Sequence, residues 1–82
     1  MLEENILPVE IDGQTYVLRG TGGEERLRMT ADLVAQKIAA TRTRCPHYST
    51  TRAAMLAALQ IAEEMLVLQE EYRDMLEAAD IG

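Results

Sequence analysis

Apolar and polar residues alternate near the start of the chain, and the alternation continues on both sides of one turn. The apolar residues at every second position are Leu7, Val9, Ile11, Tyr16 and Leu18. Between them lies Asp12-Gly13, a dipeptide typical of a two-residue turn in a β-hairpin. A turn of this length sets Ile11 opposite Gln14, which places the five apolar side chains on one face. We therefore predict a hairpin between residues 6 and 19.

A helical pattern follows between about residues 22 and 44. Its apolar residues recur at three- and four-residue steps, as expected for one narrow stripe on a helix: Leu27, Ala31, Val34 and Ile38. Thr21 and Glu24 have the spacing of a capping box, in which the hydroxyl and the carboxylate bind free N–H groups of the first turn. Pro46 disfavours helical geometry at the residue before it, so the helix should end near residue 44.

A second helix is predicted from Ser49 or Thr50 to about residue 79, roughly 45 Å of chain. Residues 53–59 are apolar on all sides, and two apolar stripes then run along the helix. One, here called the seam, follows a heptad spacing through Ala54, Ala58, Ile61, Met65, Leu68, Tyr72, Met75 and Ala79. The other, the front stripe, consists of Met55, Leu59, Ala62 and Leu66 and is followed by Gln69 and Arg73. We expect the front half to be buried on two sides and the rear half on one.

The rear half of this helix has nothing in its own chain to pack against. A hairpin and a helix of about 20 residues are too small to cover a rod of about 45 Å. We therefore predict that the seam meets the same seam of another copy, with an interface formed by Ala58, Ile61, Met65, Leu68, Tyr72 and Met75. The alternative is a lone amphipathic helix folded back on the rest of the chain. Glu64 and Glu71 flank the seam without matching basic residues, so the charges leave parallel and antiparallel pairing open.

The predicted fold class is α+β, a β-hairpin followed by two helices, of which the second is long and forms a dimeric or tetrameric coiled coil. Residues 1–48 make a head of hairpin and helix, and residues 49–82 make the oligomerisation helix of the same structural unit. The 82 residues include neither Trp nor Phe. Such a thin core favours oligomerisation as the source of stability.

The charge is unevenly distributed along the chain. The net charge is −6, and all of it falls on residues 53–82, because acids and bases balance in residues 1–52. This excess of acid argues against general nucleic-acid binding. The longest apolar run is seven residues long, against ~20 for a membrane span, so we expect no membrane insertion. The acidic start of the chain, with no apolar leader, predicts a cytosolic protein.

Residues that could carry chemistry do not assemble into a site. Cys45 and His47, each the only residue of its kind, fall short of the three or four ligands that zinc requires. Glu63-Glu64 and Glu70-Glu71 are expected on a solvated helix face. The segment 20–23 resembles a phosphate cradle, but the acids that follow it favour a helix cap. We predict no enzyme activity, cofactor or metal; an enzyme would require a pocket with converging polar groups.

One stretch of the chain is locally basic. Residues 41–52 contain Arg42, Arg44 and Arg52 and no acid, which suits an acidic partner. Arg42 and Arg44 have a second interpretation, since both suit the carbonyl end of the first helix. Arg52 gains nothing from the positive end of the second helix, so partner binding or a salt bridge within a dimer are its candidate roles.

Two segments resemble a known family. The sequence from Ser49 to Glu64 is similar to the signature of the bacterial cell-division protein ZapA family, and the stretch from Val9 to Tyr16 resembles its hairpin. The chain resembles the short members of that family, and the resemblance implies dimers or tetramers. It also implies binding to the tubulin-like GTPase FtsZ and cross-linking of FtsZ protofilaments at the division site, without catalysis.

We place the expected FtsZ contact on the head, around the exposed hairpin face and the start of the second helix. The residues of this hypothesis are Gln14, Val17, Arg19, Thr50, Thr51 and Arg52. The alternative function is a homodimeric coiled-coil adaptor for another cytosolic complex, which shares every structural prediction and differs only in its partner.

Overall fold

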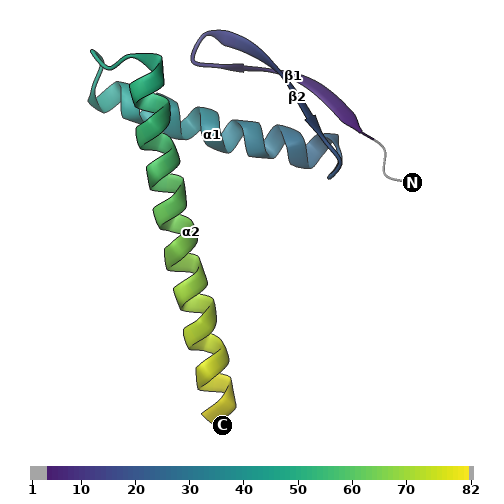
Figure 1. Cartoon of the computed structure of the whole chain (residues 1–82), viewed down its shortest axis with the longest axis vertical. Coiled ribbons are helices and arrows are strands. Elements are labelled where there is room, and N and C mark those ends of the chain that lie inside the picture. The colour runs from purple at the N-terminus through teal and green to yellow at the C-terminus, as the bar shows by residue number, and fades with distance from the viewer. Residues whose placement is uncertain (1–3, 82) are drawn as a thin grey trace.

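The computed structural model describes residues 4–81, which form two strands and two helices (Figure 1). The elements are β1 (Asn5–Ile11), β2 (Gln14–Gly20), α1 (Glu24–Arg44) and α2 (Thr50–Ile81). The predicted α+β class, with a hairpin followed by two helices and a long second helix, is confirmed.

The hairpin has the predicted register, with Ile11 opposite Gln14 and Leu7 opposite Leu18. Asp12 and Gly13 both have positive φ, 52° and 79°, as the tight turn between two twisted strands requires. Coverage of the apolar face is uneven. Leu7 of β1 is buried, whereas Tyr16 of β2 is 41% exposed. The chain alone therefore leaves part of the hairpin's inner face uncovered.

Helix α1 begins and ends where the sequence predicts, but its N-terminal cap differs from the prediction. Gly23 is the N-cap, with φ 96° and no side-chain cap bond, so the predicted capping box of Thr21 and Glu24 is wrong. The reason is the backbone: the chain enters the helix through a positive φ that favours glycine. This conformation places Thr21 two residues before the cap. Glu24 remains in the first turn, where the helix dipole favours an acid.

The core is small and lies where α1 meets the hairpin and the first turns of α2. Its five buried apolar residues are Leu7, Ala31, Ile38, Ala53 and Ala57. Ile38 packs with Ala53 and Ala57 in one cluster. Because Ala53 and Ala57 are small, the backbones of the two helices approach closely at this contact.

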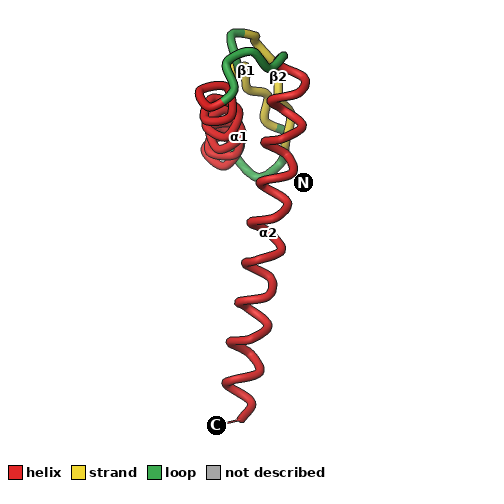
Figure 2. The backbone as a smooth tube through the Cα atoms, turned by 90° about the vertical axis from the view of Figure 1, so that its left-hand side faces the viewer, coloured by secondary structure: helices red, strands yellow, loops and turns green. Residues whose placement is uncertain are grey.

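Helix α2 leaves the head and continues alone, giving the molecule the form of an L (Figures 1 and 2). The molecule measures 51 × 42 × 14 Å along its principal axes. Its radius of gyration is 16.6 Å, against about 12 Å for a compact chain of this length. The accessible surface is 6743 Å², roughly 1,800 Å² more than the ~4,900 Å² expected for a compact monomer of this mass. The single chain thus exposes an area large enough for a stable interface.

The expectation for the front half of α2 is only partly met within one chain. One side of the front half is buried, because Ala53 and Ala57 pack against Ile38 of α1. On the other side, Met55 and Leu59 of the front stripe are 61% and 59% exposed. The second side is therefore uncovered in the single chain. None of the described helices is both long and apolar enough to cross a membrane.

Candidate functional site

The turn of the hairpin and the turn between the helices meet at one end of the head, here called the tip. The Thr50 hydroxyl donates a hydrogen bond of 2.6 Å to Oδ2 of Asp12. Nη1 of Arg42 lies 3.6 Å from the same oxygen. One carboxylate therefore joins the hairpin turn, the end of α1 and the start of α2.

Aromatic and cationic groups continue this network. Nη1 of Arg42 donates to the carbonyl of Tyr48 at 2.8 Å, and the guanidinium of Arg52 lies 4.3 Å from the centroid of the Tyr48 ring. The His47 ring stands edge-on to Tyr48, with 5.2 Å between centroids. Arg42 thus binds the interhelical turn and the hairpin rather than the last carbonyls of α1. Arg52, which is exposed, gains a cation–π contact within its own chain.

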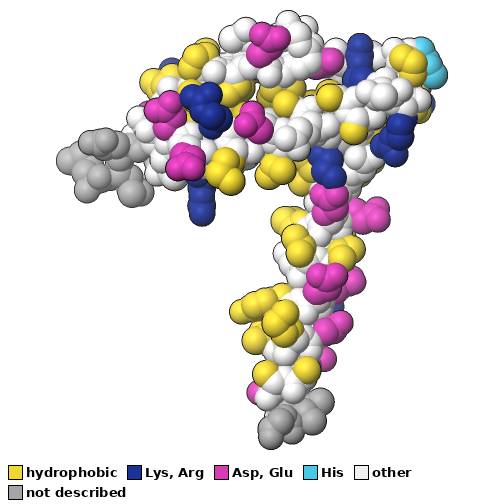
Figure 3. Space-filling view, turned by 180° about the vertical axis from the view of Figure 1, so that it is seen from behind, with side chains coloured by type: hydrophobic (Ala, Val, Ile, Leu, Met, Phe, Trp, Pro, Cys, Tyr) yellow, Lys and Arg dark blue, Asp and Glu magenta, His cyan; other side chains and the backbone are white. Residues whose placement is uncertain are grey.

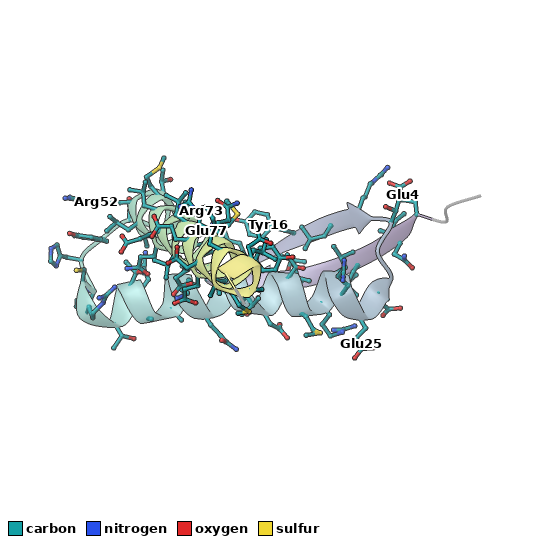
Figure 4. All side chains as sticks on the ribbon, turned by 90° about the horizontal axis from the view of Figure 1, so that it is seen from below. Glu4, Tyr16, Glu25, Arg52, Arg73 and Glu77 are labelled. Carbon is teal, nitrogen blue, oxygen red and sulfur yellow. The ribbon has the colours of Figure 1, made fainter. Side chains whose placement is uncertain are left out.

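Charge separates the two ends of the head. Arg42 and Arg44 lie in the last turn of α1 and Glu24 in its first turn. Figure 4 places Arg52 at the same end as the interhelical turn, and Glu4 and Glu25 at the opposite end. Bases accompany these acids at the start of α1, where Arg28 is paired with Glu24, so the tip is the more basic of the two ends.

The six residues predicted for partner binding fall on two surfaces. Thr51 and Arg52 are exposed at the tip, and Thr50 is half-buried there. Val17 and Arg19 lie further along β2, on the outward face, with Pro8 opposite Val17. Val17 is 62% exposed.

Gln14 does not share the face of Val17. It lies on the same side of β2 as Tyr16, whose hydroxyl donates to its side-chain oxygen at 3.0 Å. It is next to the hairpin turn, so the Asp12–Thr50 bond brings it near the start of α2. Thr50 is already engaged in that bond and positions the tip.

Sequence reasoning missed the roles of Asp12 and Tyr48. Asp12 was explained by the turn alone, and its partners Arg42 and Thr50 lie 30 and 38 residues away in the chain. No local spacing signals contacts of this range. The absence of any acid among residues 41–52 was the available signal, since Arg42 then requires an acid from elsewhere in the chain.

The seam is largely uncovered. Ile61 is half-buried, while Met65, Leu68, Tyr72 and Met75 are 54% to 67% exposed. Figure 3 shows apolar side chains along one edge of α2 and acidic side chains along the other. The apolar edge is the one on the side toward which the first half of α1 extends.

A wide, open hollow of about 950 Å³ lies in the angle between α1 and α2. Its lining mixes Lys37 and Arg44 with Glu63, Glu64 and Glu71 around Val67. Lys37 forms an ion pair with Glu64 across this angle. Within residues 4–81, no three His, Cys, Asp or Glu side chains come together in a way that could hold a metal ion.

Comparison with known proteins gives one consistent result. The family profile described as "Cell division protein ZapA" matches residues 7–80. The cell-division protein ZapA of Geobacillus sp. (strain WCH70) is 30% identical over 69 residues, covering 84% of this chain and 79% of that protein. The ZapA of Bacillus anthracis is 31% identical over 70 residues, covering 85% and 79%.

A solved structure is similar over nearly the whole length. The mutant dimer of ZapA from Geobacillus stearothermophilus is 30% identical, with a TM-score of 0.74 over 98% of this chain and 93% of that chain. A dimer among the relatives is consistent with a seam that is uncovered in the single chain. The family consists of cell-division proteins and not of enzymes, in agreement with the prediction of no catalysis. Since the family profile spans all four elements of the fold, this chain belongs to the ZapA family of cell-division proteins.

Proposed function

We propose that this protein binds FtsZ and cross-links its protofilaments at the division site in the cytoplasm. The observation that carries the proposal is the uncovered seam on a long helix that is joined to the head by packing. Two chains paired through this seam hold two heads at fixed positions. Membership in the family supplies the partner, and the seam supplies the reason for two binding sites.

A paired molecule suits cross-linking because its second contact is intramolecular. Once one head has bound a filament, the other head is held at a high local concentration near a neighbouring filament. Each contact is then free to be weak, so that bundles assemble and dissolve. In this proposal the head and the start of α2 bind the partner, while the rest of α2 sets the spacing of the heads.

The proposed contact combines the basic tip with the outward face of β2. Arg52 and Thr51 present charge and hydrogen-bonding groups to an acidic surface, and Gln14 follows the hairpin turn, which Asp12 joins to the start of α2. Val17 and Arg19 extend the surface along the hairpin. Thr50 contributes by holding Asp12.

The direct test is sedimentation of FtsZ assembled with GTP, with and without the protein, together with the mass of the protein in solution. We expect the protein to pellet with FtsZ, to increase the pelleted FtsZ and to have the mass of a dimer or tetramer. An oligomer that fails to pellet with FtsZ would contradict FtsZ binding and favour the adaptor function instead.

Charge reversal at Arg52 tests the placement of the contact. Arg73 is the matched control, because it is the other base on α2 and is exposed in the rear half. Figure 4 labels both residues. We expect Arg52→Glu to weaken co-sedimentation about tenfold, roughly 1.4 kcal/mol, and Arg73→Glu to leave it nearly unchanged. Equal behaviour of the two variants would remove Arg52 from the contact.

A further inference from the structure

The hairpin is a sheet of only two strands, so each strand has one edge without a neighbouring strand. The two-residue turn makes Ile11 and Gln14 a hydrogen-bonded pair. Bonded and non-bonded pairs then alternate along the hairpin. On β2, the backbone N–H and C=O groups of Thr15, Val17 and Arg19 therefore point away from β1. These three residues form the open edge of the hairpin.

The opposite edge, on β1, is protected against further pairing. The residues whose backbone groups point outward there are Ile6, Pro8 and Glu10. Pro8 has no N–H and lies at the centre of the strand, opposite Val17. A proline and a charge on an edge strand both discourage the addition of another strand. The open edge carries only the charge of Arg19, at its end, so the two edges of one hairpin differ in their capacity to pair.

The described part of the chain leaves the open edge uncovered. Apart from the hairpin's own ladder, no hydrogen bond among residues 4–81 involves the backbone of its three residues. All three are exposed. Helix α1, along which the hairpin lies (Figure 1), covers β1 better than β2, since Leu7 is buried and Tyr16 is 41% exposed. The outward backbone groups of a seven-residue strand are thus free to pair with another chain.

The side chains of the open edge indicate the chemistry of a matching strand. They share the outward face of β2, because side chains alternate between the two faces of a strand. Val17 is 62% exposed, which favours an apolar residue opposite it. Arg19 takes part in none of the three ion pairs among residues 4–81, which favours an acid opposite it.

We propose that an extended segment of FtsZ adds to the open edge as a third, antiparallel strand. This inference rests on the proposed function and specifies how the contact is made. A segment of about five residues forms about six backbone hydrogen bonds with the three residues of the edge. In strand addition, these bonds supply affinity, while alternate side chains supply specificity. The segment carries an acid opposite Arg19 and an apolar residue opposite Val17.

The strands of a second copy suit the open edge less well. Strand β2 contains no acidic residue, so a second β2 would leave Arg19 without a counter-charge. Strand β1 would bring Pro8 to the edge, and Pro8 has no N–H to donate. A segment of another protein meets neither restriction. The open edge is also continuous with the proposed FtsZ contact, which already includes Val17 and Arg19.

The test is hydrogen exchange of the native protein, alone and bound to FtsZ assembled with GTP. Mass spectrometry of peptic fragments measures the deuterium that each strand takes up. The outward amides of the open edge should exchange rapidly in the protein alone, because they are not part of the ladder. With FtsZ bound, uptake by residues 14–20 should fall by about three deuterons, one for each of these amides. Uptake by residues 5–11 should fall by less than about one, since their edge gains no strand.

Two results would overturn the strand addition. One is unchanged uptake by residues 14–20 although the protein pellets with FtsZ, which would leave FtsZ binding itself intact. The other is slow exchange of the outward amides in the protein alone, which would show that a second copy occupies the edge. Failure to pellet with FtsZ would instead contradict the proposed function.

Substitutions in the hairpin provide a second measurement, the affinity for FtsZ in co-sedimentation. Val17→Pro removes the N–H at the centre of the open edge and should weaken binding about 10- to 100-fold, because a carbonyl of the added strand loses its donor. Val17→Ala keeps the N–H and should cost about fivefold or less, the effect of a smaller side chain.

Glu10→Pro is the matched control for the proline. It removes an outward N–H from the edge of β1 and should change the affinity less than about threefold, since no strand is added there. A Val17→Pro variant that binds as tightly as Val17→Ala or Glu10→Pro would overturn the proposal. The exchange measurement uses the native chain, so its result does not depend on how well the proline variants fold.

Discussion

The head and the rear half of α2 obtain their structure in different ways. In the head, contacts join residues far apart in sequence, such as Asp12 with Thr50 and Ile38 with Ala53. In residues 67–80, every residue is exposed. The head is held together by packing and hydrogen bonds among its own side chains, whereas the rear half is held only by the backbone hydrogen bonds of the helix. One short sequence thus combines a region that packs by itself with a region that has no packing partner within the described part of its own chain.

This difference sets the stability expected for each region. A lone helix of about 15 residues is marginal in water, so the rear half alone should fray. Burial of Leu68, Tyr72 and Met75 in a pair would stabilise it by about 1.5 to 3 kcal/mol per large side chain. The order of the rear half is therefore expected to depend on protein concentration, while the contacts at the tip are made within one chain.

The largest expected effect is the loss of pairing in Ile61→Glu. Ile61 lies in the seam and is half-buried even in the single chain, so a carboxylate there would lose its water without gaining a partner. We expect the dimer to lose about 3 to 5 kcal/mol and to dissociate at micromolar concentration. Light scattering measures the mass, and circular dichroism should show lower helicity.

Val67→Glu is the control for that variant. It adds the same charge to the same helix, but Val67 borders the acidic hollow between α1 and α2 and not the seam. This variant should keep the native mass. A native mass for Ile61→Glu would show that the seam has been assigned to the wrong face.

A smaller loss is expected when the tip network is broken. Asp12→Ala removes the acceptor of the Thr50 hydroxyl and the carboxylate beside Arg42. The Asp12 side chain is only 18% exposed, so water replaces these contacts poorly. We expect unfolding by urea to show a loss of about 2 kcal/mol. Asp12→Asn keeps an acceptor and tolerates the positive φ, so its loss of unfolding free energy should be clearly smaller than that of Asp12→Ala. Equal losses for the two variants would show that the charge of Asp12, and not its hydrogen bond, stabilises the tip.

The same comparison explains what the sequence could predict. Within the head, the hairpin register follows from Asp12-Gly13, and the end of α1 near Pro46 follows from steric exclusion; both agree with the structure. These features depend on neighbours in the chain. The seam is predicted on the same kind of basis, since heptad spacing is a local pattern, and its pairing with a second copy stays a prediction.

Contacts between distant segments could not be predicted in the same way. Nothing near Asp12 indicates that it binds Thr50, and nothing near Tyr48 indicates that Arg52 lies over its ring. The predicted cap of α1 was wrong for a different reason. The spacing of Thr21 and Glu24 fits a capping box, but it does not reveal that the backbone at Gly23 takes φ 96°. The sequence therefore allowed exposed residues of the head to be named as candidates, and that assignment stays a prediction, whereas the contacts that position them were missed.

The two helix starts provide a matched pair of smaller effects. Ser49 caps α2, because its hydroxyl oxygen accepts a bond of 3.1 Å from the backbone N–H of Arg52. Ser49→Ala should therefore destabilise the protein by about 1 kcal/mol. Thr21→Ala should have almost no effect, since α1 has no side-chain cap. Urea unfolding at one fixed protein concentration compares them; a loss of 1 kcal/mol for Thr21→Ala would show that a capping box forms in solution.

The smallest effect is expected at the joint between the two regions. Lys37 of α1 forms an ion pair with Glu64 of α2, and the two side chains are 31% and 57% exposed. A pair so open to water contributes between 0 and ~1 kcal/mol, so Lys37→Met should lower stability by at most that amount. High salt should abolish the difference in stability between Lys37→Met and the native chain, because it screens exposed charges.

A double-mutant cycle with Glu64→Gln isolates the free energy of the Lys37–Glu64 pair. A coupling well above 1 kcal/mol that survives high salt would show that this pair fixes the angle of α2, whereas we attribute the angle to the packing of Ala53 and Ala57 on Ile38.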